Sequence, residues 1–235
     1  MKKLFYFLFT ISCVCLSSCN SDEPEEILDP TIPLYQEYEV NFYENGVTNV
    51  FANFRKHNQF GQSVKLNNGA KILANDFGMI YFRSSDYADL GVESNVRLYD
   101  YTAQMAADEV VFDFYRSQDT KITNKVSSKD ITNVKIPENL SQIHNGEPIK
   151  VGEEPIKQGE KLVTRLVSLS NNQMVYDAKV SIYDMTAVFN NVPVGIYQLQ
   201  VMNSKVIATT QNDRDAFGVI TIYYLDNQQV SIVPD

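Results

Sequence analysis

The sequence predicts an all-β protein built from two consecutive antiparallel β-sandwich domains. From Tyr35 onward, apolar and polar residues alternate with a period of two, and β-branched and aromatic residues are frequent. Clusters of Asn, Asp, Gly and Ser separate the alternating runs, and no run has the 3.6-residue period of an amphipathic helix. Many short strands of this kind, with regular turn signals, are typical of β-sandwiches.

The first two strands are predicted by alternation and by the turn between them. Tyr38, Val40 and Phe42 should share one face of the first strand. Asn45-Gly46 follows, and this dipeptide between alternating runs is a strong hairpin signal. The return strand should place Val50, Ala52 and Phe54 on one face.

The rest of the N-terminal block contains further short strands. Tyr101 to Asp108 is the one stretch that suggests a helical turn. Strands are expected at Ser63–Leu66, Lys71–Ala74, Met79–Arg83, Asn95–Tyr101, Glu109–Tyr115, Lys121–Val126 and Ile131–Ile136.

A segment rich in proline and glycine, Pro137 to Glu154, interrupts the pattern. It places the boundary between a first domain at 35–137 and a second at 138–235, each of a size that can hold a sandwich core. Strands are expected in the second at Lys161–Leu169, Met174–Tyr183, Ala187–Val192, Ile196–Met202, Val206–Thr210, Val219–Leu225 and Gln229–Val233.

One stretch of the second block resembles a known family. Phe189, the Val192-Pro193-Val194-Gly195 turn and the outgoing Tyr197-Gln198-Leu199-Gln200-Val201 are similar to the prealbumin-like, or carboxypeptidase-regulatory-like, β-sandwich. The glycine that the family carries before the phenylalanine is missing here. The resemblance implies an Ig-like/prealbumin-like fold and an accessory role in structure or binding, with Tyr197, Leu199 and Val201 on one strand face.

The N-terminus predicts export and a lipid anchor. Met1-Lys2-Lys3 and the short apolar run to Leu16 read as a signal peptide, residues 1–18. Leu16-Ser17-Ser18-Cys19 resembles the lipobox of bacterial lipoproteins, which implies cleavage before Cys19 and its lipidation. An ordinary secretory signal with a chance cysteine is the alternative. Loss of Cys13 and Cys15 with the signal would leave the mature chain without a free thiol.

Residues 19–34 read as an extended acidic tether. The stretch holds five acidic residues and no basic one, and its prolines disfavour helix. Asn20 to Glu26 resembles the export tag of surface lipoproteins of Bacteroidota, which implies an outer-membrane lipoprotein exposed at the cell surface. A solvated acidic tether without an export role remains the alternative. The first block is also similar in style to Ig-like domains of such lipoproteins.

The residue patterns of catalysis, metal binding and nucleic-acid binding are missing from the sequence. The net charge of −9 argues against nucleic-acid binding, which requires a basic face. His57 and His144 lie in polar stretches expected to be loops, with no partner at ligand spacing, so no metal or cofactor is predicted. Neighbouring acids such as Asp86 and Asp89, or Asp108 and Glu109, are expected by chance in so acidic a chain. A non-catalytic protein is therefore expected.

Aromatic residues offer the one candidate ligand surface. The chain has 14 Tyr, 13 Phe and no Trp. In the expected strand Asn95–Tyr101, alternation places Arg97, Tyr99 and Tyr101 on one face, and Tyr115 should point outward from the next strand. If these strands pair, the four residues would form an outward patch suited to a glycan or a protein. The alternative is that the tyrosines serve the strands or cover the neighbouring domain.

The predicted function is a lipid-anchored surface protein that binds or adheres to a glycan or protein. The alternative is an accessory in envelope assembly or nutrient uptake, docked on outer-membrane partners, and a hydrolase comes third. An exposed aromatic patch would favour ligand binding, a long unpaired edge strand would favour docking by strand addition, and two carboxylates facing across a cleft would favour an enzyme.

Overall fold

A computed structural model of the chain describes residues 32–66, 69–81, 101–170, 174–210 and 218–234. Within these ranges every element is a β-strand, apart from the short 3₁₀ turn η1 (Ser128–Asp130). The predicted all-β class and the layered sandwich are confirmed. No helix of the described residues is long and apolar enough to cross a membrane. The expected signal peptide and most of the tether lie outside the described residues.

The largest layer is a nine-stranded sheet that combines strands from both ends of the chain. Its order is β12-β11-β15-β16-β1-β2-β6-β5, and β9 pairs with the far end of β16. β1 and β16 run parallel, whereas β1–β2, β15–β16 and β11–β15 are antiparallel. The strands are β1 (Leu34–Tyr43), β2 (Thr48–Lys56), β5 (Ile80–Tyr81), β6 (Tyr101–Met105), β9 (Gln142–Ile143), β11 (Glu160–Ser168), β12 (Val175–Asp177), β15 (Gly195–Ala208) and β16 (Val219–Ile232).

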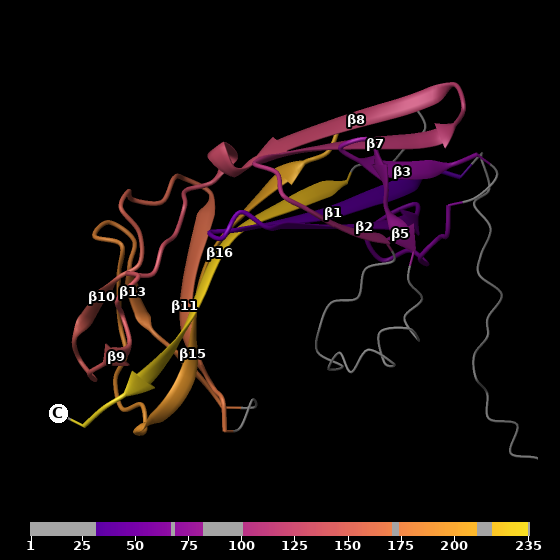
Figure 1. Cartoon of the computed structure of the whole chain (residues 1–235). Helices are drawn as coiled ribbons and strands as arrows, with labels where there is room; N and C mark the ends of the chain where they lie inside the picture. The colour runs from indigo at the N-terminus through magenta and orange to yellow at the C-terminus, as the bar shows by residue number, and fades with distance from the viewer. Residues whose placement is uncertain (1–31, 67–68, 82–100, 171–173, 211–217, 235) are drawn as a thin grey trace, which may run out of the picture.

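Two smaller sheets cover the large one. The first has the order β4-β3-β7-β8 and the second β10-β14-β13. The first is built from β3 (Lys71–Ala74), β4 (Phe77–Gly78), β7 (Glu109–Ser117) and β8 (Thr120–Ser127), and the second from β10 (Pro148–Lys150), β13 (Lys179–Ser181) and β14 (Thr186–Val188). Figure 1 shows the large sheet bending between two halves, with one small sheet beside each half.

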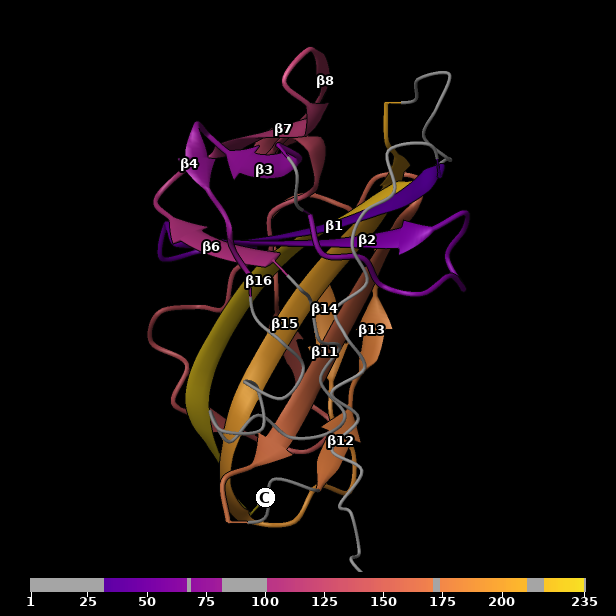
Figure 2. The same ribbon diagram turned by 90° about the vertical axis from the view of Figure 1, so that its right-hand side faces the viewer.

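Both small sheets cover the same face of the large sheet. In β16 the even-numbered apolar residues, from Ile220 to Ile232, are buried at both ends of the strand. The ladder between β15 and β16 runs over 14 residue pairs without a bulge, so the strand faces do not exchange along it. The opposite face of the large sheet is therefore free of a covering sheet in the described part of the chain. Figure 2 looks onto β11, β15 and β16 in the lower half, with β13 and β14 behind them.

The hairpin and the core of the first block follow the predicted alternation. Tyr38, Val40 and Phe42 are buried on one face of β1, and Val50, Ala52 and Phe54 on the same face of β2. In the turn between them Gly46 has φ +82°, a left-handed conformation that favours glycine. The ring of Phe112 lies 4.6 Å from that of Tyr38, and the ring of Phe114 lies 4.7 Å from that of Phe54 (centroid distances). Stacked aromatic residues thus join the two layers.

The turn that carries the family resemblance also behaves as expected on its outgoing strand. Tyr197, Leu199 and Val201 are buried together on the covered face. The Tyr197 hydroxyl donates to the Pro193 carbonyl at 2.8 Å and so holds the turn against the strand. Gly195 matters for space rather than for its φ, because a Cβ there would lie 3.2 Å from the Tyr197 ring. The structure confirms the strand and its faces, not the Ig-like topology.

Several local expectations are wrong. Residues 174–183, expected as one strand, form β12 and β13 in two different sheets. Residues 101–105 form β6 instead of a helical turn, since they pair with β2. Residues 131–136 form no strand, because the N–H groups of Thr132 and Ile136 bond side chains of the large sheet. The pairs of strands expected at 196–210 and 219–233 are two continuous strands. Their polar centres resemble turns in the sequence, but each pairs across the ladder with a regular part of the other strand, as in Asn203 with Tyr224 and Asp226 with Val201.

The expected domain boundary at residues 137/138 lies between η1 and β9. Each block supplies its own covering sheet. The nine-stranded sheet, however, crosses this position, because β16 of the C-terminal block pairs with β1 of the N-terminal block over seven residue pairs. Whether the two blocks fold independently stays a prediction.

Candidate binding groove

The structure does not bring the predicted aromatic patch together. Arg97 and Tyr99 lie outside the described residues, as does the predicted lipidation site Cys19. Tyr101 is buried, with 5% of its surface exposed, so its expected outward position is wrong. Tyr101 pairs with Ala52 across β6 and β2, and residues directly opposite share a face, in this case the core. Its hydroxyl accepts a hydrogen bond from the Leu66 N–H at 2.6 Å.

Tyr115 does point outward, but in a different sheet. β7 pairs with β3 and β8, not with β6, so Tyr115 lies between Lys71 and Lys121 on the outer face of the four-stranded sheet. The two ammonium groups lie 4.8 and 5.7 Å from the centre of its ring, within cation–π range. The ring is thus occupied by neighbouring lysines, which explains its position without a ligand.

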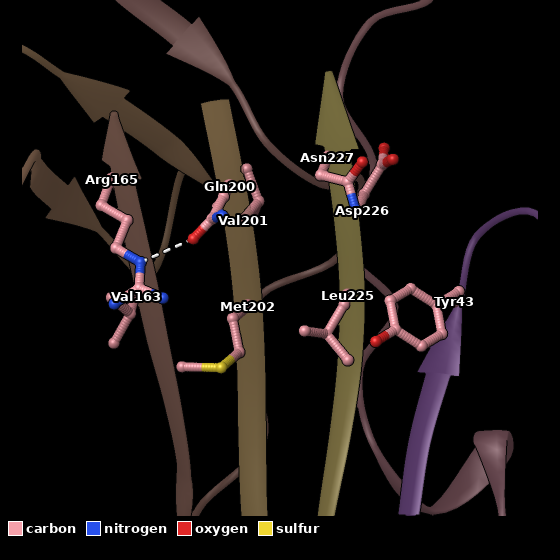
Figure 3. A pocket seen from close by; sticks show the side chains of 9 residues that line it. All are labelled: Tyr43, Val163, Arg165, Gln200, Val201, Met202, Leu225, Asp226 and Asn227. Carbon is pink, nitrogen blue, oxygen red and sulfur yellow. Dashed lines mark hydrogen bonds between the residues drawn. The ribbon is translucent and has the colours of Figure 1, made fainter. Parts of the chain in front are cut away.

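A groove of about 220 Å³ lies on the uncovered face of the large sheet, where the sheet bends. Figure 3 shows the side chains from four adjacent strands that line it. Alternation places most of them on this face, since their sequence neighbours point into the core, whereas Val201 and Asp226 belong to the alternate set of their strands, which points to the covered side. The lining residues are Tyr43 of β1, Val163 and Arg165 of β11, Gln200, Val201 and Met202 of β15, and Leu225, Asp226 and Asn227 of β16.

The groove combines an apolar floor with polar side chains. Val163, Met202 and Leu225 come from three neighbouring strands and form an apolar band across the sheet. The Arg165 Nε donates to Gln200 Oε1 at 2.8 Å, which holds the guanidinium beside the groove (Figure 3). At the other wall, Asn227 Oδ1 accepts a hydrogen bond from the side-chain amide of Gln198, on β15, at 3.3 Å. The site therefore offers hydrogen-bond donors above an apolar surface, an arrangement typical of ligand sites.

Asp226 lines the groove but its carboxylate is directed to the covered side of the sheet. Its Oδ2 accepts a hydrogen bond from the Ile136 N–H at 2.6 Å. Burial raises the pKa of Asp226 above its ordinary value, and the neighbouring Glu44 carboxylate adds to this, although N–H donors and Lys135 oppose it. The negative charge of Asp226 is thus engaged by the segment behind the sheet rather than presented to a ligand.

Polar contacts hold the bend under the groove. The Tyr224 hydroxyl donates to Glu44 Oε2 at 2.8 Å, and Lys135 Nζ lies 3.4 Å from Glu44 Oε1. Burial and this hydrogen bond raise the pKa of Tyr224, so its hydroxyl stays protonated and remains a donor. Because Glu44, Lys135 and Tyr224 come from the first hairpin, the connecting segment and β16, the contacts tie the two halves of the sheet together.

A second buried cluster supports the bend from β11 and β15. Asn203, which is fully buried, donates to Thr132 O at 2.9 Å and to Glu160 Oε2 at 2.8 Å. The other Glu160 oxygen accepts from the Thr132 N–H at 3.1 Å. Burial would raise the pKa of Glu160, but the hydrogen bonds outweigh it and hold this pKa below its ordinary value. The groove is therefore built on a braced part of the sheet.

In the part of the chain that the structure describes, the residues considered for catalysis or metal binding do not gather. His57 and His144 both follow the end of a strand, in loops as expected. Glu109 forms an ion pair with Lys125 at 2.8 Å, and Asp86 and Asp89 lie outside the described residues. Among the described residues, no group of three His, Cys, Asp or Glu side chains could hold a metal ion.

The groove residues were not singled out by the sequence. Alternation within each strand does indicate which residues point away from the core. It does not indicate that β1, β11, β15 and β16 lie side by side, because β1 and β11 are more than a hundred residues apart in the chain. Comparison with models of known protein families and with curated proteins finds no match to this chain.

Proposed function

We propose that this protein is a lipid-anchored, non-catalytic binding or adhesion protein of the outer membrane, exposed at the cell surface, which recognises a glycan or a protein. The observation that carries the binding role is the groove on the uncovered face, where side chains of four strands converge on a braced bend. The lipobox-like Leu16 to Cys19 and the acidic tether behind it support the anchored location.

Location is tested on intact cells. Proteinase K should degrade the protein while a periplasmic control protein stays intact. Cys19→Ala should abolish incorporation of labelled fatty acid and release the protein from membranes. Cys15→Ala is the matched control, since it changes a cysteine inside the predicted signal and should leave anchoring unchanged. Survival of the wild-type protein until the cells are lysed would refute surface exposure.

Binding is tested separately, by incubating the full-length protein with arrays of glycans and of extracellular proteins. A ligand whose binding is lost in Gln200→Leu but retained in Lys161→Gln would support the groove as the site. Lys161 lies on the same face of β11 but outside the groove, and its side chain is exposed. Equal binding by both variants would place the ligand elsewhere on the molecule.

One observation favours the alternative, an accessory that docks on envelope partners. β8 is eight residues long and is the last strand of its sheet, and no strand in the described part pairs with its outer edge. Such an edge can accept a strand from a partner. Thr123→Cys, exposed on β8, should then crosslink to an envelope protein in cells, whereas Asn190→Cys, exposed outside the strands, should not. Equal crosslinking at both positions would contradict docking at β8.

A further inference from the structure

The groove contains a guanidinium whose terminal nitrogens are available to a ligand. Arg165 uses its Nε for Gln200, and no acidic side chain of the described residues forms an ion pair with it. Asp177 lies opposite Arg165 on the edge strand β12 but forms none. A guanidinium held by its Nε presents its two terminal nitrogens side by side, the geometry that binds a carboxylate through two hydrogen bonds.

The surroundings of Arg165 indicate what carries the carboxylate. The amides of Gln200 and Asn227 supply both donors and acceptors, which suits hydroxyl groups because each hydroxyl also donates and accepts. The Tyr43 ring stands at the end of the groove, and Met202 and Leu225 form the floor beside it (Figure 3). Hydroxyl partners above an apolar floor match a sugar ring, which has polar edges and an apolar face.

An extended peptide fits this site less well. Peptides that bind sheets add a strand at an edge, where backbone groups are free. The groove instead crosses β11, β15 and β16, whose backbones are paired with one another, so only side chains are available to a ligand. Within the proposed binding function, on which this inference rests, we propose that the groove binds an acidic glycan, with Arg165 pairing the carboxylate of a uronic acid.

The test compares two sugar probes that differ in charge. The full-length protein is titrated by calorimetry with a galacturonic acid tetramer and with a galactose tetramer. We expect the acidic tetramer to bind roughly ten- to a hundredfold more tightly, the contribution of charge-assisted hydrogen bonds. Arg165→Gln should remove this difference, whereas Lys161→Gln, a loss of the same charge on the same strand face, should preserve it. Gln200→Leu, which removes the support of Arg165, should reduce it.

Three results would overturn the proposal. Equal binding of both tetramers by wild-type protein would show a neutral glycan site, and the proposed binding function would survive. Binding of hexaglutamate as tightly as the acidic tetramer, with the same dependence on Arg165, would show a site for acidic peptides. No binding of the acidic tetramer at millimolar concentration, by protein that still binds a ligand on the arrays, would refute the acidic glycan alone. Unfolding curves of each variant distinguish a loss of affinity from a failure to fold.

Discussion

Asn203 should be essential to the stability of the bend. Its amide donates to a backbone carbonyl, Thr132 O, and to the Glu160 carboxylate, and the side chain is fully buried. Asn203→Ala removes both donors. A neutral hydrogen bond contributes about 0.5–1.5 kcal/mol and one to a charged group about 1.5–3 kcal/mol. The free energy of unfolding at pH 7 should therefore fall by about 2–4 kcal/mol.

The loss of unfolding free energy caused by Asn203→Ala should depend on pH. The folded-state pKa of Glu160 lies below its ordinary value, so its ionised form contributes stability above the unfolded pKa. That stability is lost as the pH falls through the folded pKa. The variant lacks one of the hydrogen bonds that lower this pKa, so it loses less stability than wild type when the pH falls. The difference between variant and wild type should therefore shrink as the pH falls through the folded pKa of Glu160, toward the about 1–2 kcal/mol that neutral hydrogen bonds contribute.

The assay is urea unfolding followed by circular dichroism at pH 7 and at pH 3. Asn190→Ala is the control, because Asn190 is exposed and lies outside the strands; its unfolding free energy should stay within about 0.5 kcal/mol of wild type. A deficit of Asn203→Ala below about 1 kcal/mol at pH 7, or one that grows toward pH 3, would refute the assignment of the bend's stability to this cluster.

Three further substitutions test the core, a buried hydroxyl and the first turn, each by its free energy of unfolding. Phe112→Ala should lower the free energy of unfolding by about 3–5 kcal/mol, since this fully buried ring joins the two layers. A decrease of less than about 2 kcal/mol would contradict its place in the core. Tyr101→Phe should cost about 1–3 kcal/mol, because the buried Leu66 N–H loses its acceptor, and an unchanged value would show that this N–H is satisfied otherwise. Gly46→Ala, at φ +82°, should cost about 1 kcal/mol, whereas Gly78→Ala, with open space at its Cβ and no positive φ, should not; equal values for the two would exclude backbone strain as the cause.

The strands of the first block were predictable from local pattern. Alternation identified the buried faces of β1, β2 and β7, and Asn45-Gly46 marked the turn of the first hairpin. These features depend on neighbouring residues only, because a strand exposes alternate side chains to opposite sides wherever it lies in a sheet. The all-β class follows from the same signal repeated along the chain.

The expectations that failed depend on partners distant in sequence. Tyr101 is inward because it pairs with Ala52. β15 continues through Asn203 because the half-buried Glu160 carboxylate and the Thr132 carbonyl accept both hydrogen bonds that its side-chain NH2 group donates. Polar residues in a strand centre resemble a turn when their partners are unknown, since an unpartnered amide would not be buried.

The candidate groove likewise depends on partners that are distant in sequence. The parity of each strand shows that Tyr43, Arg165, Gln200 and Asn227 can point away from the core. Their meeting in one groove requires β1 to pair in parallel with β16, a contact between the two ends of the chain that no local signal encodes. The sequence therefore carries the strands and their buried faces, while the order of strands in the sheet creates the groove, because a surface made by several strands exists only once they lie side by side.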